Sequence, residues 1–302
     1  MRAAIRSAAA CCVGLVLSCS TTGPDAPEGD EDQPRSCPSL GAPVRTGTLK
    51  VGPLDEASGM VASHHHAGVL WSHNDGGDAE LFAIDEAGTW LAMLTVGGAT
   101  VLDLEDIARA RTSAYDVLWL ADIGDNDAVR PSVALIAVPE PEGLEAGMLE
   151  AVAAARVEVT YPNGPADAEA FFIDSRSGDG YIITKTRADA GPAEVLKVPG
   201  PLGAGPVTAE SVAVVDGLGP ITAADMAANG RALVVRSDDR ALWWALDDGL
   251  SVEEALAEPG CAVPLPVEAA GESVAFTVDG AGYHSTSEGA GAPIHRVSLE
   301  SG

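Results

Sequence analysis

The sequence predicts an all-β protein, a five-bladed β-propeller, and two observations carry this prediction. The first is a recurring segment that runs straight into an apolar strand and that opens, in four of five copies, on an acidic or hydroxyl residue. Its copies begin at Ser58, Glu105, Glu169, Ala224 and Glu272. They lie 47, 64, 55 and 48 residues apart, a spacing typical of radially repeated four-stranded blades. The second observation is that three further strand-like runs follow each of the first four copies.

Turn residues separate these runs, as between antiparallel strands of one sheet. The predicted strands after the leading segments are 69–71, 80–84 and 90–94; 117–120, 133–138 and 156–159; 181–184, 194–198 and 211–215; and 232–235, 241–245 and 261–263. The fifth unit supplies only 274–278, 283–285 and 294–297 before the chain ends. We expect Arg45 to Val51 to provide its missing outer strand, because this would remove a sheet edge and tie both ends into one blade.

Two segments interrupt the pattern. Gly143 to Ala155 has apolar residues at helical spacing and is predicted as a short helix, and Ser251 to Leu256 is a second candidate. We interpret both as insertions before outer strands. Six blades, one of them irregular, are the alternative.

The N-terminus indicates export. Arg2 and Arg6 precede a short apolar run, Ala8 to Leu17, which is typical of a signal peptide over residues 1–18. The run ends in Val16-Leu17-Ser18-Cys19, similar to the lipobox of bacterial lipoproteins, so we expect lipidation at Cys19. Ordinary cleavage and release is the alternative. The predicted location is the cell envelope, as a membrane-anchored lipoprotein on its periplasmic or outer surface.

Residues 19–40 are predicted to be a flexible tether, because 20–36 are rich in Pro, Gly, Asp and Glu. Residues 41–302 then form a single propeller domain. Cys37 and Cys261 are a disulfide candidate in an exported protein, with two separate thiols as the alternative.

The charge balance excludes some partners. There are 17 Lys and Arg against 45 Asp and Glu, a net charge of −28, which repels nucleic acid and anionic membrane surfaces. Membrane contact is therefore expected through the lipid anchor only, and we expect a monomer. Most of the acids are explained by a solvated acidic surface.

The recurring segment predicts a metal site. In a propeller the inner strands begin around one mouth, so we expect Ser58, Glu105, Glu169 and Glu272 to converge there. Oxygen ligands without His or Cys suit a hard ion such as Ca²⁺. Ala224 is the gap, and Thr222 and Asp225 beside it are possible substitutes. The alternative is that these side chains cap strand ends or bind water.

The second strands end at the same mouth and supply further candidates. We predict Asp122, His73 and Glu288 as proton acceptors in catalysis and Lys185, Arg236 and Asn74 as groups that bind an anionic ligand. A structural ion-pair network involving Lys185 and Arg236 is an equal alternative. His64-His65-His66 is expected in a turn at the opposite end. An ordinary turn is the main interpretation there, and metal binding is the minor alternative.

Several motifs support a resemblance: Trp71-Ser72-His73-Asn74-Asp75, Leu104-Glu105-Asp106-Ile107-Ala108, Ala121-Asp122-Ile123-Gly124-Asp125-Asn126, Asp167-Ala168-Glu169-Ala170 and Ser287-Glu288-Gly289. From Leu49 to Ser298 the chain resembles a family of bacterial secreted or lipidated β-propeller proteins with no settled reaction. It is more distantly similar to calcium-activated apyrases. That resemblance implies one central Ca²⁺ held by a Ser or Glu of each blade, and hydrolysis of nucleoside di- and triphosphates. Ser58, Glu105, Glu169 and Glu272 fit it, whereas Ala224 stands where a Ser is expected.

Two functions remain open at this point. One is a metal-dependent hydrolase of a small anionic substrate, such as a phosphoester or a lactone. The other is a non-catalytic propeller with a structural ion that binds a ligand or a cell-surface protein.

Overall fold

The computed structural model describes residues 37–112, 116–145, 147–186, 191–203, 205–247 and 249–300. The predicted signal peptide, Cys19 and the part of the predicted tether before Cys37 lie outside these residues. Within these ranges, no helix is long and apolar enough to cross a membrane.

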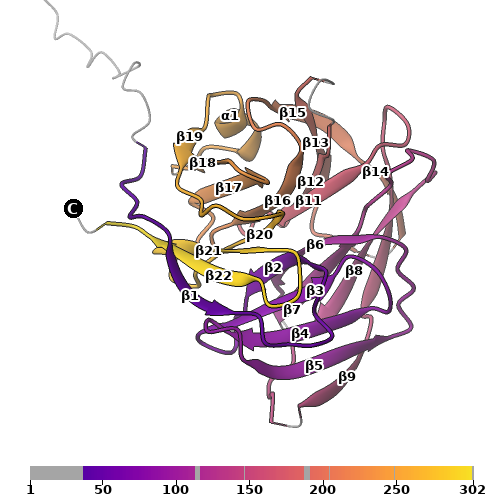
Figure 1. Cartoon of the computed structure of the whole chain (residues 1–302). Coiled ribbons are helices and arrows are strands. Elements are labelled where there is room, and N and C mark those ends of the chain that lie inside the picture. Colours follow the sequence, from indigo (N-terminus) through magenta and orange to yellow (C-terminus); the bar gives the residue numbers. More distant parts are fainter. Residues whose placement is uncertain are drawn as a thin grey trace, which may run out of the picture. The chain divides into compact units, whose positions relative to one another are not determined.

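The described strands form five separate sheets, each of which is one blade (Figure 1). From the inner to the outer strand, blade 1 contains β2 (Ala57–Ala62), β3 (Val69–Asn74), β4 (Glu80–Asp85), β5 (Trp90–Gly97) and β9 (Met148–Val152). Blade 2 contains β6 (Leu104–Arg111), β7 (Asp116–Asp122), β8 (Val133–Pro139), β10 (Ala155–Thr160) and β14 (Gly205–Thr208). Blade 3 contains β11 (Ala168–Ile173), β12 (Gly180–Thr184), β13 (Ala193–Val198) and β15 (Glu210–Val215). Blade 4 contains β16 (Ile221–Met226), β17 (Ala232–Ser237), β18 (Ala241–Ala245) and β19 (Cys261–Val263). Blade 5 contains β20 (Gly271–Phe276), β21 (Gly282–Ser287), β22 (Pro293–Ser298) and β1 (Val44–Thr48).

The five inner strands form a closed ring. β2 contacts β6, β6 contacts β11, β11 contacts β16, β16 contacts β20, and β20 returns to β2. The predicted five-bladed propeller is therefore confirmed, and the six-bladed alternative is wrong.

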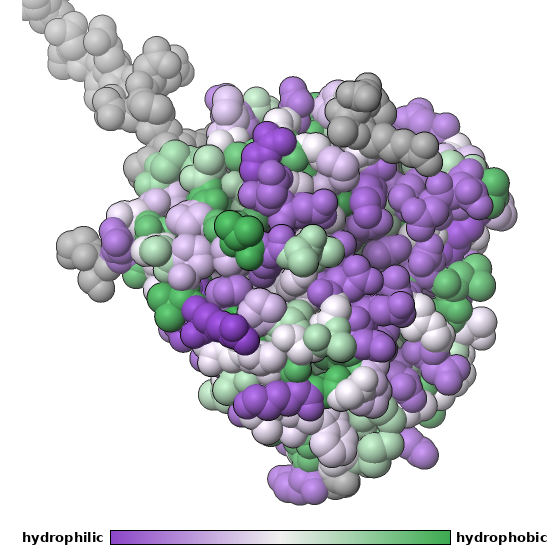
Figure 2. All heavy atoms as spheres, viewed as in Figure 1, coloured by the Kyte–Doolittle hydropathy of each residue, from purple (hydrophilic) through white to green (hydrophobic). Residues whose placement is uncertain are grey.

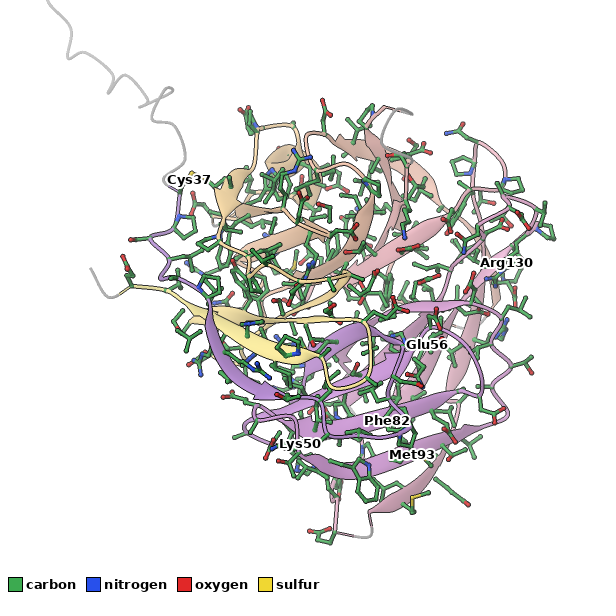
Figure 3. All side chains as sticks on the ribbon, in the orientation of Figure 1. Cys37, Lys50, Glu56, Phe82, Met93 and Arg130 are labelled. Carbon is green, nitrogen blue, oxygen red and sulfur yellow. A yellow bond between two sulfur atoms is a disulfide. The ribbon has the colours of Figure 1, made fainter. Side chains whose placement is uncertain are left out.

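The hydrophobic core is divided among the five interfaces between neighbouring blades. Side chains alternate along each strand, so β7 sends Leu118 and Leu120 toward blade 1 and Val117 and Trp119 toward blade 3. In blade 1, Phe82 of β4 and Met93 of β5 are neighbours across the sheet and pack together (Figure 3). Because a neighbouring blade covers each face, the inner strands are buried almost continuously rather than at alternate residues.

Side chains near the axis tie the inner strands of different blades together. Ser58 Oγ of β2 donates to the carbonyl oxygen of Glu105 on β6 at 2.6 Å. The buried carboxylate of Asp106 accepts from the backbone N–H of Phe171 on β11 at 2.8 Å and of Ala224 on β16 at 3.3 Å. One carboxylate therefore holds three blades together.

Two further contacts complete the ring of polar ties. Asp225 accepts from the backbone N–H of Phe276 at 2.7 Å, which joins β16 to β20. Ser273 Oγ of β20 donates to the carbonyl oxygen of Ser58, so the last inner strand is tied to the first.

The N-terminal strand closes the last blade as predicted. β1 pairs antiparallel with β22, with Val44 opposite Arg296 and Thr48 opposite Pro293. In Figure 1 the indigo β1 lies beside the yellow β22. A disulfide joins Cys37 to Cys261 of β19, with a Cα–Cα distance of 5.5 Å, so the start of the described chain is also held to blade 4.

The prediction of a helix over Gly143 to Ala155 is wrong. Residues Met148–Val152 form β9, which pairs parallel with β5. Leu149 and Ala151 face the core between blades 1 and 2, whereas Met148 and Val152 of the supposed apolar helix face are exposed. The open edge of β5 offers hydrogen-bond partners to the backbone of residues 148–152, whereas a short helix without tertiary contacts is only marginally stable. The segment therefore forms a strand.

The other predicted insertion is helical. α1 (Val252–Leu256) starts at Ser251, whose side chain accepts from the backbone N–H of Glu254 while Glu254 bonds back to the backbone of Ser251. One further strand escaped prediction: β14 pairs parallel with β10, at the outer edge of blade 2.

We predict that Asp106→Ala lowers the free energy of unfolding by about 3 kcal/mol or more, because several buried N–H groups lose their acceptor at once. Asp106→Asn, which keeps one acceptor oxygen, is expected to lie between this variant and the wild type. Asp239→Ala, at an exposed ion pair with Arg240, serves as the control. Chemical denaturation measures the difference; equal losses for Asp106→Ala and Asp239→Ala would contradict the bridging role.

Candidate functional site

A break in strand register recurs at the start of every inner strand. The pairing with the second strand skips one residue after Leu104, Ala168, Ile221 and Gly271, and it skips Ser58 and Gly59 against one residue of β3 after Ala57. A residue at such a bulge is released from the backbone ladder, which re-aims its side chain. The released positions are those of Ser58, Glu105, Glu169, Thr222 and Glu272.

This register corrects one member of the recurring segment. Ala224 was aligned with the leading residues of the other blades, but Thr222 holds the equivalent position in β16. Its Oγ1 donates to the carbonyl oxygen of Gly271 at 2.8 Å. Every blade therefore carries a side-chain oxygen at this level. The sequence signal that could have identified Thr222 is the start of the strand. Ile221 precedes the bulge in β16, as Leu104 does in β6.

Four of the five bulges line one polar cavity of about 220 Å³, which we term the acidic mouth; Thr222, in the fifth bulge, is buried and does not line it. Its lining residues are Glu56, Ala57, Ser58, Asp75, Asp103, Glu105, Asn126, Glu169, Lys185, Glu272 and Glu288. The predicted metal ligands Ser58, Glu105, Glu169 and Glu272 are thus brought together, and so are Lys185 and Glu288.

Burial dominates the electrostatics of the acidic mouth. It raises the pKa of Glu105 to about 10, and the neighbouring carboxylates of Glu169 and Asp103 add to this rise. Burial also raises the pKa values of Glu169 and Glu272 to about 7, although Lys185 opposes both shifts. These carboxyl groups are crowded enough to hold protons when no cation compensates them.

Lys185 supplies the positive charge among the lining residues. Its Nζ forms an ion pair with Glu169, and it is also close enough to Glu272 and Glu105 for their charges to raise its pKa. Lys185 also lines a second cavity, of about 430 Å³, together with Asn126, which both cavities share. Lys185 therefore lies between the acidic mouth and this adjoining cavity.

Close backbone approach shapes one side of the mouth. A Cβ atom on Gly124 would lie 2.3 Å from Oε1 of Glu105 and 2.5 Å from the carboxylate of Asp103. A larger residue at position 124 would therefore displace the carboxylates of Glu105 and Asp103 from their present positions.

Two predicted site residues lie behind the mouth rather than in it. Asn74 accepts from the backbone N–H of Glu56 at 3.1 Å and donates to the carbonyl oxygen of Pro53 at 2.7 Å. Asp122 is fully buried and accepts from the backbone N–H of Asp103 at 3.0 Å. Asn74 and Asp122 therefore fix the backbone at Glu56 and Asp103. Both of these acids line the mouth, and neither was predicted from the sequence.

His73 and Arg236 are also outside the acidic mouth. His73 is buried, its Nδ1 lies 2.9 Å from the carbonyl oxygen of Asn74, and burial lowers its pKa to about 4. Arg236 is buried too; it pairs with Glu268 at 2.9 Å and donates to the carbonyl oxygen of Ser273 at 3.0 Å. Arg236 therefore forms a structural ion pair, although its partner is not one of the central acids.

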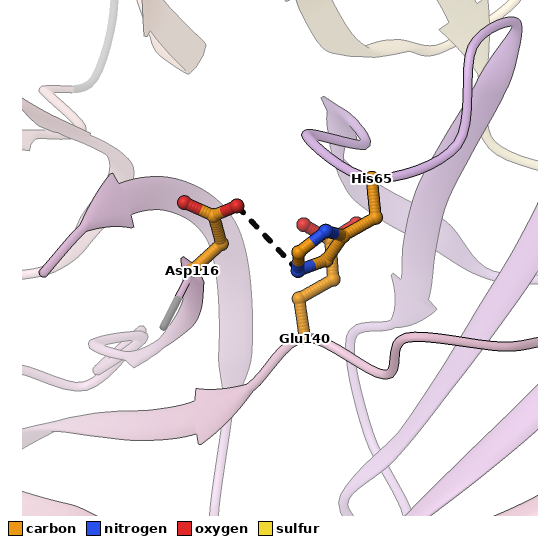
Figure 4. A group of neighbouring side chains, drawn as sticks. All are labelled: His65, Asp116 and Glu140. Atoms are coloured by element: carbon orange, nitrogen blue, oxygen red, sulfur yellow. Dashed lines mark ion pairs between the residues drawn. The ribbon is translucent and has the colours of Figure 1, made fainter. Parts of the chain in front are cut away.

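A second group of possible ligands lies at the opposite end of the ring. His65, Asp116 and Glu140 each offer a nitrogen or oxygen atom, and these atoms lie within 4.8 Å of one another (Figure 4). His65 belongs to the His64-His65-His66 turn, which is at the end expected from the sequence. Asp116 and Glu140 were not singled out, since each is an isolated acid at a strand end.

Figure 2 shows hydrophilic side chains gathered across the middle of the face in view. The net charge of −28, which comes from the sequence, attracts cations and repels free anions.

Comparison with protein-family models and with curated proteins finds no match. Among solved structures, the chain resembles one titled "Crystal structure of Nidogen/Laminin Complex", with 12% sequence identity and a TM-score of 0.46. The match covers 78% of this chain and 73% of that chain. The fold assignment rests on the five sheets of the chain itself, and neither family resemblance found from the motifs gains support.

We predict that the metal-free protein loses stability as pH rises from about 5 to 8. Glu169 and Glu272 have pKa values of about 7 in the folded state against an ordinary value of 4.5, so the folded state binds more protons in this range. Thermal unfolding in the presence of a chelator measures how the melting temperature changes with pH. Glu169→Gln should make this dependence weaker, whereas Glu142→Gln, at an exposed position, should leave it unchanged. A melting temperature that rises over this range would contradict the crowding of the acids.

Proposed function

We propose that the acidic mouth binds one hard divalent cation, Ca²⁺, and that this ion recruits a small anionic ligand. The observation that carries the proposal is the recurring bulge, which brings side-chain oxygens from four of the five blades to one cavity: those of Ser58, Glu105, Glu169 and Glu272. Three of these groups are the carboxylates of Glu105, Glu169 and Glu272, which a divalent ion would compensate in place of protons. Oxygen donors alone are the ligand set that Ca²⁺ prefers.

The ligand class follows from the charges around the ion. A free anion would be repelled by the acids of the mouth, so it needs the cation as its point of attachment. Lys185 supports such a ligand because its ammonium borders both the mouth and the adjoining cavity of about 430 Å³. A phosphate or carboxylate group could bridge the ion and Lys185, with the rest of the molecule in that cavity.

Binding without catalysis is the second candidate, and one observation favours it. Of the three predicted proton acceptors, Asp122 and His73 are buried away from the mouth, and Glu288 alone lines it. Hydrolysis would have to rely on Glu288 as general base toward a water molecule on the ion. The distant likeness to calcium-activated apyrases makes nucleoside di- and triphosphates the first substrates to test, with phosphoesters and lactones next.

We further propose that the protein is exported and held at a membrane by lipid on Cys19, with the propeller as a separate domain. The arrangement of residues 1–36, with a basic start, an apolar run and a polar tether, supports this. A surface-anchored propeller is also suited to a cell-surface protein partner.

We expect Ca²⁺ to raise the melting temperature, and Glu169→Gln or Glu272→Gln to weaken Ca²⁺ binding by about tenfold or more, since each removes a carboxylate ligand. Lys185→Met should have the opposite effect and strengthen Ca²⁺ binding about tenfold, because the ammonium competes for Glu169. Exposed Lys50 and Glu142 supply the matched controls Lys50→Met and Glu142→Gln. Calorimetric titration measures all of these affinities. No heat of binding and no shift in melting temperature with Ca²⁺ would rule out the central ion.

The ligand is tested with the Ca²⁺-loaded protein. Phosphate should bind only when Ca²⁺ is present, and Lys185→Met should lose phosphate while it keeps the ion. Turnover of a nucleotide, phosphoester or lactone that Glu288→Gln abolishes would establish the hydrolase; binding without turnover would favour the non-catalytic alternative.

Cys19→Ser should move the protein from the membrane fraction to the soluble fraction of the exported material, because the acyl chains have no other attachment point. The control is Cys37→Ser, which breaks the Cys37–Cys261 disulfide but keeps the lipidation site. Unchanged membrane association of Cys19→Ser would contradict the anchor.

A further inference from the structure

The end of the ring opposite the acidic mouth carries ligand chemistry of a different kind. Asp116 begins β7, Glu140 follows β8, and a backbone hydrogen bond of 2.9 Å from the N–H of Glu140 to the carbonyl oxygen of Asp116 fixes the two residues side by side. His65 reaches them from the loop between β2 and β3 of the neighbouring blade (Figure 4).

Both carboxylates are buried: Asp116 is 7% exposed and Glu140 is 4% exposed. Glu140 has hydrogen-bond donors around it, and no ion pair with it occurs among the described residues. Arg111 forms an ion pair with Asp116, whereas the negative charge of buried Glu140 meets hydrogen-bond donors only, and this is an environment that favours a cation.

The other contacts of these acids leave one oxygen of each for a ligand bond. Trp71 Nε1 donates to Oε1 of Glu140 at 2.9 Å, and the hydroxyl of Ser63 donates to the same oxygen. Oε2 receives only the backbone N–H of His64, at 3.1 Å. Outer contacts of this type orient the ligands of metal sites.

The two carboxylate oxygens of Asp116 also have different partners. Its Oδ1 accepts from Nε of Arg111 at 2.8 Å, whereas its Oδ2 faces Nε2 of His65 at 3.4 Å. Two ligands at tetrahedral positions around Zn²⁺ are themselves about 3.4 Å apart, so this pair already has the separation that one ion requires.

The loop that carries His65 is held in place by Ser63. The Ser63 hydroxyl accepts from the backbone N–H of His65 at 3.1 Å and of His66 at 2.8 Å, and it donates to Glu140. A single side chain thus connects the histidine loop of blade 1 to the acid of blade 2.

The positive charges of two arginines, Arg109 and Arg111, would repel a bound cation, but the positions of both side chains limit this repulsion. The Arg111 side chain is 69% exposed and engages the outer oxygen of Asp116 only. Arg109 is buried and directs Nη1 to the carbonyl oxygen of Ala62 at 3.0 Å. Neither arginine forms an ion pair with Glu140 among the described residues.

We propose that His65, Asp116 and Glu140 form a second metal site, which takes a first-row transition ion such as Zn²⁺ and is independent of the proposed Ca²⁺ site. One imidazole with two carboxylates suits Zn²⁺ or Mn²⁺, whereas an oxygen-only set suits Ca²⁺. Three protein ligands also leave a coordination position for water or a ligand. His65 lines a solvent-open cavity of about 410 Å³, which gives the ion a route of entry.

Calorimetric titration of the whole propeller with Zn²⁺ tests the site, in saturating Ca²⁺ and with Glu169→Gln as a second background so that the acidic mouth does not contribute. We expect one Zn²⁺ per chain in both cases. His65→Asn should weaken binding at least about tenfold, and its exposed position makes misfolding no explanation for the loss. Glu140→Gln should weaken it similarly.

The neighbours supply matched controls. His66→Asn changes the adjacent histidine, and Glu142→Gln changes an exposed acid near Glu140; both should bind Zn²⁺ like the wild type. X-ray absorption at the zinc edge should show imidazole scattering that His65→Asn removes. Wild-type affinity in His65→Asn, or a loss that follows His66→Asn instead, would overturn the proposal.

Discussion

The structure depends on polar ties between inner strands that belong to different sheets. These strands lie beside one another around the axis, but the backbone hydrogen bonds of each strand pair it with the second strand of its own blade. The contacts between blades at this radius therefore come from side chains: Ser58 to β6, Asp106 to β11 and β16, Asp225 to β20, and Ser273 back to β2. Apolar side chains pack between neighbouring blades outside this radius, and the polar ties fix which residues of adjacent inner strands lie beside each other. The geometry of both ends of the ring follows from them.

At the acidic mouth, the same strand starts that make these ties also carry the bulges. A bulge releases one residue from pairing, and its repetition in five blades gathers three glutamates into a cavity of about 220 Å³. Burial and mutual repulsion then raise their pKa values. Lys185 relieves only part of the charge, because its ammonium is directed chiefly at Glu169. The mouth is therefore an arrangement with a surplus of buried acid, for which a proton or a metal ion is the natural complement.

The two ends of the ring differ in the kind of donor they present. The mouth offers carboxylate and hydroxyl oxygens from the strand starts. The opposite end offers an imidazole, because the loop between β2 and β3 contains histidines and Ser63 folds it against Glu140. Different donor sets on one rigid scaffold allow two ions to be distinguished without any movement of the blades.

By itself, the sequence predicted the fold class and the closing strand from period and strand spacing; it favoured five blades over six and a Cys37–Cys261 disulfide over two separate thiols, and the structure decided both. It also determined that Ser58, Glu105, Glu169 and Glu272 share one end of the ring. The tertiary structure decided which polar residues reach a cavity. Asn74 and Asp122 turned out to hold the backbone at Glu56 and Asp103, and Thr222 replaced Ala224, because bulges shift register by one residue and leave no mark on composition. It also decided that 148–152 is a strand, since the free edge of β5 lies far away in sequence. Contacts such as that of His65 with Asp116 join residues from different blades, and only the closed ring brings these together.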